Sequence, residues 1–280
     1  MKESNKNRKA ARISVPLWQI PPGLTIGNFD YTKSSSIADN YDQFLAGNEL
    51  DLIDRQTLRR YLPPLEQGPP QGLVVADFGC GNGRSLMPLL NEGYRGLGID
   101  LSVPMLESFA GKAEQASLSD RVGLVQSNLV ELDAFTDDSI DAAICMFSTL
   151  GMIHGRQHRN RFLKHVRRML KPEQPFILHA HSSLFQIRQP GGIRSAASSI
   201  WKASRGKQEF GDRTATYRGV KNMFIHSFRR AELKRDLKQA GFTVNKWIGI
   251  PPASNQTTDL DAPLPWLSDF RLAGWIVVCS

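Results

Sequence analysis

Three closely spaced glycines follow an acidic residue in the segment VVADFGCGNGRSLMPLL, residues 74–90. Glycine allows positive φ angles and lets a ligand lie directly against the main chain, because no β-carbon intervenes. A dinucleotide-binding loop, G-x-G-x-x-G, would place its third glycine at position 84, but that residue is Arg84 and the glycine comes one position earlier. The acid Asp77 would also repel a pyrophosphate at this loop. The segment therefore predicts a site for a ligand that carries positive charge.

S-adenosylmethionine carries an ammonium and a sulfonium group, and DFGCGNG resembles the first motif of the class I S-adenosylmethionine-dependent methyltransferases. The chain is similar to that family, in its type 11/25-like domains, over most of residues 40–280. In the family, an acid and three glycines hold the methionine part of the cofactor. The resemblance assigns this role to Asp77, Gly79, Cys80, Gly81, Asn82 and Gly83.

The resemblance continues at the ends of the next two predicted strands. In GIDLS, Asp100 would hold both ribose hydroxyls, since two carboxylate oxygens match a vicinal diol, and Leu101 would lie against the adenine. In QSNL, Asn128 stands where the family commonly has an acid. Its carbonyl oxygen would accept from the adenine amino group, its amide would donate to a ring nitrogen, and Leu129 would offer a backbone N–H. Asp100 as a helix cap and Asn128 as a turn residue remain alternatives.

Three further features carry the resemblance. DSIDAAICMFSTLGMI resembles the fourth-strand motif, in which a backbone carbonyl near Cys145 or Met146 would hold the ammonium group. Tyr41 resembles an aromatic of the family's N-terminal cover over the cofactor, and a purely structural role is an equal alternative. LKPEQPFILHAH resembles the family's turn into the fifth strand, with Glu173 and Gln174 in place of two glycines.

Methyl transfer from a sulfonium is an in-line displacement, so the protein mainly aligns the nucleophile and excludes water. A general base helps only when the acceptor arrives protonated. His154, after the fourth strand, is the candidate base that we select, and His179 and His181 at the end of the fifth strand are further candidates. Each of these histidines could instead simply line a loop or a strand end. We expect no metal.

Apolar runs typical of strands alternate with helical patterns, which predicts βαβ units on a parallel sheet. The expected strands are GLVVADFG, GLGID, VGLVQSN, SIDAAICMFS, PFILHAH, FTVNKWIGI and AGWIVVCS. We therefore predict an α/β fold with a doubly wound, seven-stranded, mostly parallel sheet of the Rossmann-like methyltransferase type. Ligands of such sheets bind outside the carboxyl ends of the strands, where all the candidate residues would meet.

Composition divides the chain into unequal parts. Residues 1–38 are expected to form a basic, weakly structured arm, and residues 39–280 the methyltransferase domain, which starts with a helix over 36–62. Residues 182–225 would be an insertion after the fifth strand that caps the acceptor side. This insertion has eight Lys or Arg residues against Glu209 and Asp212, in a chain of net charge +8.

The basic insertion predicts an anionic partner, and a small anionic acceptor is the favoured hypothesis. YRGVKNMFIHSFRRAEL also faintly resembles enzymes that methylate carboxymethylated wobble uridine in tRNA, and basic residues between aromatic ones suit RNA as well. A protein that binds S-adenosylmethionine without catalysis is a third hypothesis. The oligomeric state is left open by the sequence.

Cysteine usage and hydropathy indicate the compartment. The three cysteines, Cys80, Cys145 and Cys279, are odd in number and widely spaced, which favours buried thiols over disulfides or zinc. No window approaches the roughly 18 apolar residues of a membrane span, and ISVPLWQIPPG is too short and proline-rich for a signal-peptide core. The sequence therefore predicts a cytoplasmic protein.

Overall fold

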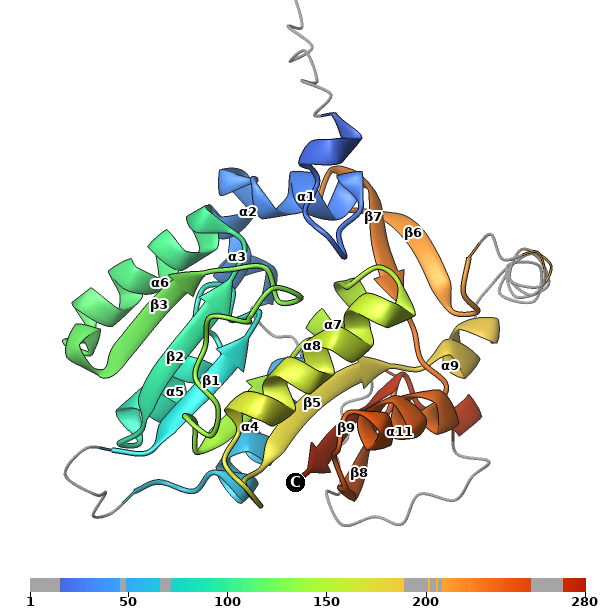
Figure 1. The fold of residues 1–280 in the computed structure, drawn as a ribbon. Helices are drawn as coiled ribbons and strands as arrows, with labels where there is room; N and C mark the ends of the chain where they lie inside the picture. Colours follow the sequence, from blue (N-terminus) through green and yellow to red (C-terminus); the bar gives the residue numbers. More distant parts are fainter. Residues whose placement is uncertain are drawn as a thin grey trace, which may run out of the picture.

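A seven-stranded sheet forms the centre of the computed structural model, which describes residues 16–45, 49–65, 72–188, 201, 205, 208–252 and 269–280 (Figure 1). Its strands are β1 (Val74–Phe78), β2 (Arg95–Asp100), β3 (Val122–Gln126), β4 (Ala142–Cys145), β5 (Phe176–His181), β8 (Val244–Ile250) and β9 (Gly274–Cys279). Their order is β3-β2-β1-β4-β5-β9-β8. Only β9 runs antiparallel to its neighbours β5 and β8. The predicted fold class is confirmed.

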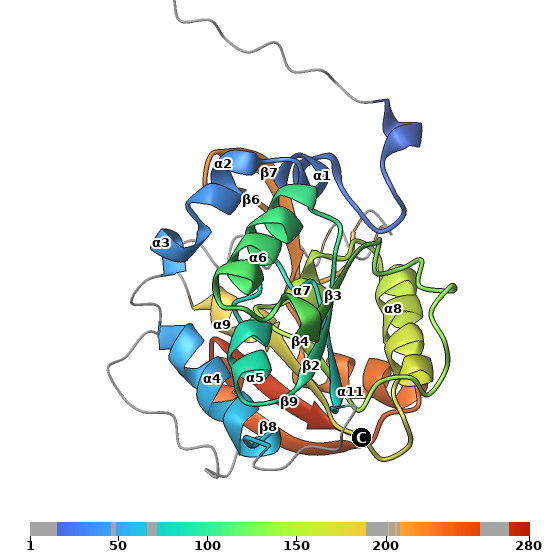
Figure 2. The ribbon, with the colours of Figure 1, turned by 90° about the vertical axis from the view of Figure 1, so that its left-hand side faces the viewer.

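Helices cover both faces of the sheet (Figures 1 and 2). On one face lie α4 (Glu49–Tyr61), α5 (Leu86–Asn91) and α6 (Val103–Gln115), and on the other α8 (Arg156–Met169) and α11 (Arg230–Gln239). The structure also contains four short helices: η1 (Leu17–Gln19), η2 (Ser119–Arg121), α7 (Thr149–Met152) and α9 (Ser183–Ile187). Alternate strand residues enter two separate cores, so that Phe78 packs with α8 and Val75 with α5. This double burial makes β1 a rigid support for the loop that follows it.

The N-terminal helix differs from the prediction, because residues 36–62 form three helices instead of one. They are α2 (Ser35–Asp39), α3 (Tyr41–Leu45) and α4. Asn40 separates the first two, and residues 46–48, between the second helix and α4, lie outside the described residues. Asn has low helix propensity, which explains why one helix does not continue through Asn40.

Part of the N-terminal segment 1–38, which was expected to be weakly structured, forms helices. Residues 1–15 lie outside the described residues, but α1 (Ile26–Thr32) and most of α2 fall within residues 1–38. Each of these helices has a side-chain cap: Thr25 accepts from the backbone N–H of Asn28, and Ser34 accepts from that of Ile37. Regular structure therefore begins before the predicted boundary at residue 38.

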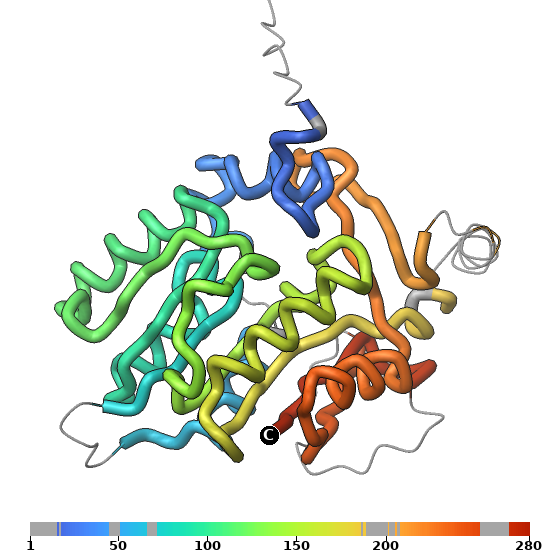
Figure 3. Tube along the Cα trace, viewed as in Figure 1, coloured from blue at the N-terminus to red at the C-terminus, as the bar shows by residue number. Residues whose placement is uncertain are grey.

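The insertion after β5 contains a two-stranded antiparallel hairpin that the sequence analysis did not predict. Its strands are β6 (Asp212–Tyr217) and β7 (Val220–His226), joined at Arg218 and Gly219, which both have positive φ angles. Helix α1 lies along β7, as the ribbon and the chain trace show (Figures 1 and 3). Two segments far apart in the sequence thus form one layer above the sheet.

A buried ionic network ties the open end of the hairpin to the main body. His226 at the end of β7 contacts Asp212 through Nδ1 at 2.7 Å and Glu232 of α11 through Nε2 at 3.1 Å. The fully buried Arg159 of α8 pairs with Glu209 at 2.6 Å. Burial alone would lower the pKa of His226, but hydrogen bonds to Asp212 and Glu232 raise that pKa above its usual value. An imidazolium that donates to both carboxylates therefore joins the hairpin to α11.

Two other expectations concern thiols and membranes. Cys80, Cys145 and Cys279 are free and buried, as predicted. In the described part of the chain, no helix combines the length and the apolar character needed to cross a bilayer.

Candidate functional site

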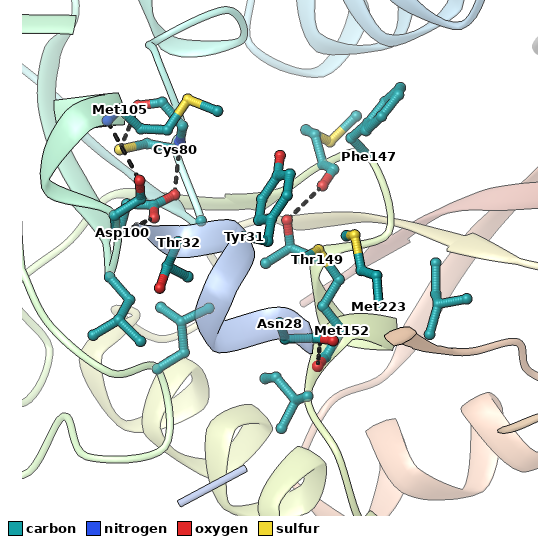
Figure 4. A pocket seen from close by; sticks show the side chains of 18 of the residues that line it. Asn28, Tyr31, Thr32, Cys80, Asp100, Met105, Phe147, Thr149, Met152 and Met223 are labelled. Carbon is teal, nitrogen blue, oxygen red and sulfur yellow. Dashed lines mark hydrogen bonds between the residues drawn. The ribbon is translucent and has the colours of Figure 1, made fainter. Parts of the chain in front are cut away.

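A cavity of about 280 Å³ lies at the carboxyl ends of the central strands, beneath α1 and the hairpin (Figure 4). Ten of the predicted cofactor residues line it: Tyr41, Asp77, Gly79, Cys80, Gly81, Asp100, Leu101, Asn128, Leu129 and Met146. Four predicted residues do not: Asn82, Gly83, Cys145 and His154. The structure therefore brings most of the predicted site together from the ends of β1, β2, β3 and β4.

The glycine loop after β1 divides into an open part and a packed part. Gly81 has φ +51°, and a β-carbon there would meet nothing within 4 Å, so the main chain is open toward the cavity. A β-carbon on Gly83 would instead lie 2.4 Å from the ring of Phe109, and the side chain of Asn82 is buried against Asp42. Gly83 and Asn82 therefore shape the loop from behind, and Gly81 leaves room for a ligand.

Asp100 holds the loops after β1 and β2 in position. Its Oδ2 accepts from the backbone N–H of Gly81 at 2.9 Å, and its Oδ1 accepts from that of Ser102 at 2.8 Å. The N-cap of α6 itself is Ser102, whose hydroxyl accepts from Met105 N–H. Each carboxylate oxygen keeps a further lone pair, so Asp100 can still accept from a ligand that donates hydroxyl groups.

The wall of the cavity beside the loop is negatively charged. Asp77 is only 2% exposed, and burial raises its pKa to about 7, an effect that Asp100 and Asp54 strengthen and Arg84 opposes. Arg84 also lines the cavity, but its guanidinium donates to Asp51 at 2.6 Å and to Asp54 at 2.7 Å. Two carboxylates of α4 thus neutralise this arginine, which leaves Asp77 and Asp100 to favour a cation.

The contacts of Asn128 differ from the prediction in part. Its amide donates to the carbonyl of Pro22 at 3.0 Å and to Glu131 at 2.9 Å, and its Oδ1 accepts weakly from Val130 N–H at 3.3 Å. Both amide hydrogens are therefore engaged, and donation to an adenine ring nitrogen would require breaking one of these bonds. The carbonyl oxygen keeps a lone pair for an amino group.

The fourth-strand end places Met146, but not Cys145, at the cavity. Cys145 is fully buried within β4. The carbonyl of Met146 accepts from the hydroxyl of Thr149 at 3.0 Å and from its backbone N–H at 3.3 Å. A ligand ammonium at this carbonyl would share it with Thr149, which itself lines the cavity (Figure 4).

The histidines are placed differently from the prediction. His154 is exposed and packs edge-to-face on Phe224, with ring centroids 4.8 Å apart, so it does not line the cavity. His181 does line it, and His179 is fully buried behind, with the two imidazole centroids 5.2 Å apart. The pKa of His181 is lowered to about 3, chiefly by burial and also by His179 and Arg213. The histidine at the cavity is therefore a neutral His181 and not His154.

Sequence analysis expected residues 182–225 to cap the acceptor side, but it named neither the individual residues that roof the cavity nor the contribution of α1. From α1 and the hairpin come Asn28, Tyr31, Thr32, Ala215, Tyr217, Met223 and Ile225. The rings of Tyr31 and Tyr217 lie against each other, with centroids 6.2 Å apart. The predicted cover residue Tyr41 stands beside them, and burial raises its pKa to about 12. The N-cap residue Thr25 marks the start of α1 in the sequence, but no local pattern pairs α1 with the hairpin.

A single buried side chain joins the two halves of this roof. Asn28, 2% exposed, donates to the carbonyls of Phe224 at 3.1 Å and Met152 at 3.0 Å. Its Oδ1 accepts from Phe224 N–H at 2.6 Å. A β-carbon on the adjacent Gly27 would lie 2.2 Å from the carbonyl oxygen of Asn222, so the helix and β7 touch main chain to main chain. These contacts fix the height of the roof over the cavity.

The fold and the matching family model identify a class I S-adenosylmethionine-dependent methyltransferase domain, as predicted. Residues 75–173 match the family model described as a methyltransferase domain, and the chain carries such a domain. The Bacillus subtilis (strain 168) protein named "Putative methyltransferase YqeM" is 30% identical over 151 residues, which are 52% of this chain and 59% of YqeM. Matches to curated relatives span 59% and 42% of those proteins' lengths.

Solved structures with the same fold cover more of the chain. The CcbJ methyltransferase of Streptomyces caelestis has a TM-score of 0.61 and 17% identity, over 89% of this chain and 98% of that one. The Burkholderia thailandensis 1,6-didemethyltoxoflavin-N1-methyltransferase, solved with 1,6-didemethyltoxoflavin and S-adenosylhomocysteine bound, has a TM-score of 0.56 and 17% identity, over 93% and 92%. At these identities the similarity establishes the fold.

S-adenosylmethionine is the cofactor of this class of domain, and the residues present fit it. The open main chain at Gly81 forms a cradle that a β-carbon would fill. The carboxylates of Asp77 and Asp100 provide negative charge for a ligand with an ammonium and a sulfonium group. An open main chain beside two carboxylates therefore suits a nucleoside that carries positive charge.

Proposed function

We propose that the protein transfers a methyl group from S-adenosylmethionine to a small acceptor bound in the same cavity. The observation that carries this proposal is the joint position of Gly81, Asp77 and Asp100 on one wall of a cavity that continues under the roof. The cofactor, when bound, supplies a methyl group on a positively charged sulfur.

The chain's own residues would bind and orient the two reactants. Asp100 would accept from the ribose hydroxyls while it keeps Gly81 and Ser102 in place. Leu101 and Leu129 would enclose the adenine, and the Met146 carbonyl would share the ammonium with Thr149. Such preorganised alignment can contribute on the order of 7–11 kcal/mol to a bimolecular displacement.

The roof would exclude water and limit the acceptor to a small molecule. Tyr31 and Tyr217 face each other above the cavity, and Asn28 fixes the two segments that carry them. The Burkholderia thailandensis relative of similar fold, solved with a small heterocycle bound, supports this acceptor size. An RNA acceptor would need a nucleotide to enter beneath this joined roof.

Calorimetric titration of S-adenosylhomocysteine into the full chain tests the cofactor half of the proposal. Asp100→Asn keeps the side-chain volume but removes the charge, so we expect affinity to fall by about 2 kcal/mol, roughly thirtyfold. The matched control is Asp120→Asn, which replaces an exposed acid of η2 that does not line the cavity. This variant should bind S-adenosylhomocysteine as the unmodified chain does. Absence of binding heat for the unmodified chain would refute the proposal.

A further inference from the structure

The acceptor end of the cavity carries almost no charge. Around His181 its lining is mostly carbon, sulfur and phenol groups, contributed by Met146, Phe147, Met152, Met223, Ile225 and Tyr217. The hydroxyl of Thr149 and the amide of Asn28 are further polar groups there, and both already have hydrogen-bond partners. The charged residues of the lining are Asp77, Asp100 and Arg84. The guanidinium of Arg84 lies 5.3 Å from the centre of the Phe147 ring, but its charge is paired with Asp51 and Asp54. An anionic acceptor would lose its hydration at this end without gaining an opposite charge.

Of the eight basic side chains that suggested an anionic acceptor, the five that the structure describes do not line the cavity, although the charge of Arg213 acts on His181. Arg218 lies over the ring of Phe44 at 3.8 Å, and Arg205 lies over Trp201 at 4.0 Å. Arg188 donates to the carbonyl of Phe270 at 3.3 Å, and Lys221 is exposed. Arg194, Lys202 and Lys207 lie outside the described residues. Among the described residues of the insertion, no Lys or Arg lines the cavity.

His181 provides the polar group at this end. Its backbone is fixed by pairing of β5 with β9 opposite Gly274, and by the hydroxyl of Ser148, which accepts from its N–H at 3.3 Å. The ring of His179 packs edge-on behind it. Within the described residues, no side chain hydrogen-bonds with the His181 imidazole. The ring is thus held in place with its nitrogen lone pair available to a ligand.

We propose that the acceptor is a neutral, largely apolar small molecule with one hydroxyl, amine or thiol nucleophile, and that His181 accepts the proton of that nucleophile. This inference rests on the proposed methyl transfer. An imidazole nitrogen of His181 takes the proton as the nucleophile's electron pair forms its bond to the methyl carbon. The carbon–sulfur bond breaks with its electron pair left on sulfur, and the imidazolium then returns the proton to water.

The electrostatic surroundings of His181 keep its imidazole neutral and also make it a weak base, so the position of the ring at the cavity, and not its basicity, carries the assignment. His179 on β5 and Arg213 on β6 disfavour a second positive charge, burial acts in the same direction, and Asp54 on α4 opposes them. The pKa of His181 is lowered to about 3, so the ring is neutral and ready to accept across the physiological range. The proton that it gains in the reaction is therefore released quickly.

The acceptor class is tested by the fate of labelled methyl groups. The full chain is incubated with methyl-tritiated S-adenosylmethionine and a small-molecule cell extract, or in parallel with total tRNA. We expect label in a product that partitions into organic solvent at neutral pH. Label that enters the solvent only after acidification, or label in acid-precipitated RNA, would support the proposed transfer but overturn this acceptor class. No label in any fraction would refute the transfer itself.

The role of His181 is tested with His181→Gln, which keeps a polar side chain but cannot take up a proton. We expect the transfer rate to fall on the order of 10²-fold, with S-adenosylhomocysteine affinity by calorimetry changed less than about twofold. The remaining rate should rise with pH as the acceptor ionises on its own, in contrast to the flat profile of the unmodified chain. If His154→Gln lowered the transfer rate as much as His181→Gln does, the assignment of the proton acceptor to His181 would be overturned.

Nuclear magnetic resonance of nitrogen-labelled histidine gives a readout without turnover. The signals absent from His181→Gln identify the ring, and they should be those of a neutral imidazole from about pH 5 to pH 8. A ring that titrates near pH 6.5 would contradict the assignment, as would a His181→Gln variant with an unchanged rate.

Discussion

Asp77 shows how one buried side chain can connect proton binding with ligand binding. It is held at the base of the glycine loop among other acids, and burial raises its pKa to about 7. Asp77 therefore binds a proton at a much higher pH than an ordinary aspartate does, before any ligand arrives. A cationic ligand favours the ionised form, so binding and proton release are linked.

Cofactor affinity should consequently depend on pH. Below about pH 7 the ligand must displace a proton from Asp77, and above that pH it need not, so the affinity for S-adenosylhomocysteine should rise from pH 6 to pH 8. Calorimetry at these pH values measures the effect. Asp77→Asn should remove the rise, whereas Asp141→Asn, at the start of β4 and paired with Lys171, should keep it. A rise that persists in Asp77→Asn would assign the linkage to another group.

At the scale of elements, the joint between α1 and β7 carries the roof. Gly27→Ala would place a β-carbon 2.2 Å from the Asn222 carbonyl oxygen and 2.8 Å from that of Lys221. Both atoms are backbone, so the helix must move away, and we expect a loss of about 1–3 kcal/mol in the free energy of unfolding. Urea denaturation measures this loss.

Gly111→Ala is the matched control for that substitution. Gly111 lies inside α6, and an added β-carbon would meet nothing within 4 Å. Because glycine costs conformational entropy in a helix, alanine there should stabilise the protein by about 0.5–1 kcal/mol. If both variants changed stability in the same direction, the close approach of α1 and β7 would be in error.

The ionic network at the open end of the hairpin predicts a second pH effect. The pKa of His226 is raised, so its contribution to stability is complete below the unfolded value near 6.5 and is lost as pH rises through the folded value. The pKa values of Asp212 and Glu232 are lowered, so their contributions are lost as pH falls through the folded values. The network should therefore stabilise the hairpin most in mildly acidic solution.

Urea unfolding of His226→Gln against the unmodified chain checks this expectation. The difference in unfolding free energy should shrink between about pH 6 and pH 9. His158→Gln, on the half-exposed side of α8, provides a histidine control with no carboxylate partner among the described residues. A constant difference would contradict an imidazolium at position 226, as would stabilisation of the unmodified chain by zinc through Glu209, His226 and Glu232.

Sequence patterns predicted the elements whose signals are local. The buried run of β1, the glycines after it and the Ser102 cap of α6 can each be read within a few residues. The hairpin could not be predicted in this way, because its strands bury only one face and the burial depends on α1. The hydrogen bonds from Asn28 to Phe224 join residues 196 positions apart. The carboxylate wall of the site was therefore predictable and its roof was not.

His154 and His181 show the same limit for single residues. His154 follows the fourth predicted strand and His181 ends the fifth, so the sequence places both near the same edge of the sheet. Their roles separate only in three dimensions, because His154 turns toward Phe224 and His181 is fixed by the β5–β9 pairing. Periodicity can locate the end of a strand, but it does not say which histidine near that end reaches the cavity.

For the whole molecule, cofactor binding should stabilise the domain and its roof together. S-adenosylhomocysteine at a hundredfold excess over its dissociation constant should add about 2.7 kcal/mol to the free energy of unfolding, and NAD should add nothing. Hydrogen exchange should slow in both α1 and β7, since both border the cavity and share Asn28. Slower exchange in α1 without any change in β7 would show that the two segments move independently.

The Asn28 joint also limits how this domain can be recombined with others of the same fold. In a chimera that takes the β6–β7 hairpin from another methyltransferase, the Asn28 amide would face a different backbone in place of the Phe224 carbonyl. The close approach of Gly27 to the Asn222 carbonyl would also be lost. Grafting must therefore exchange α1 and the hairpin as a matched pair. The 75–173 module, which holds most of the cofactor wall, could then stay as it is.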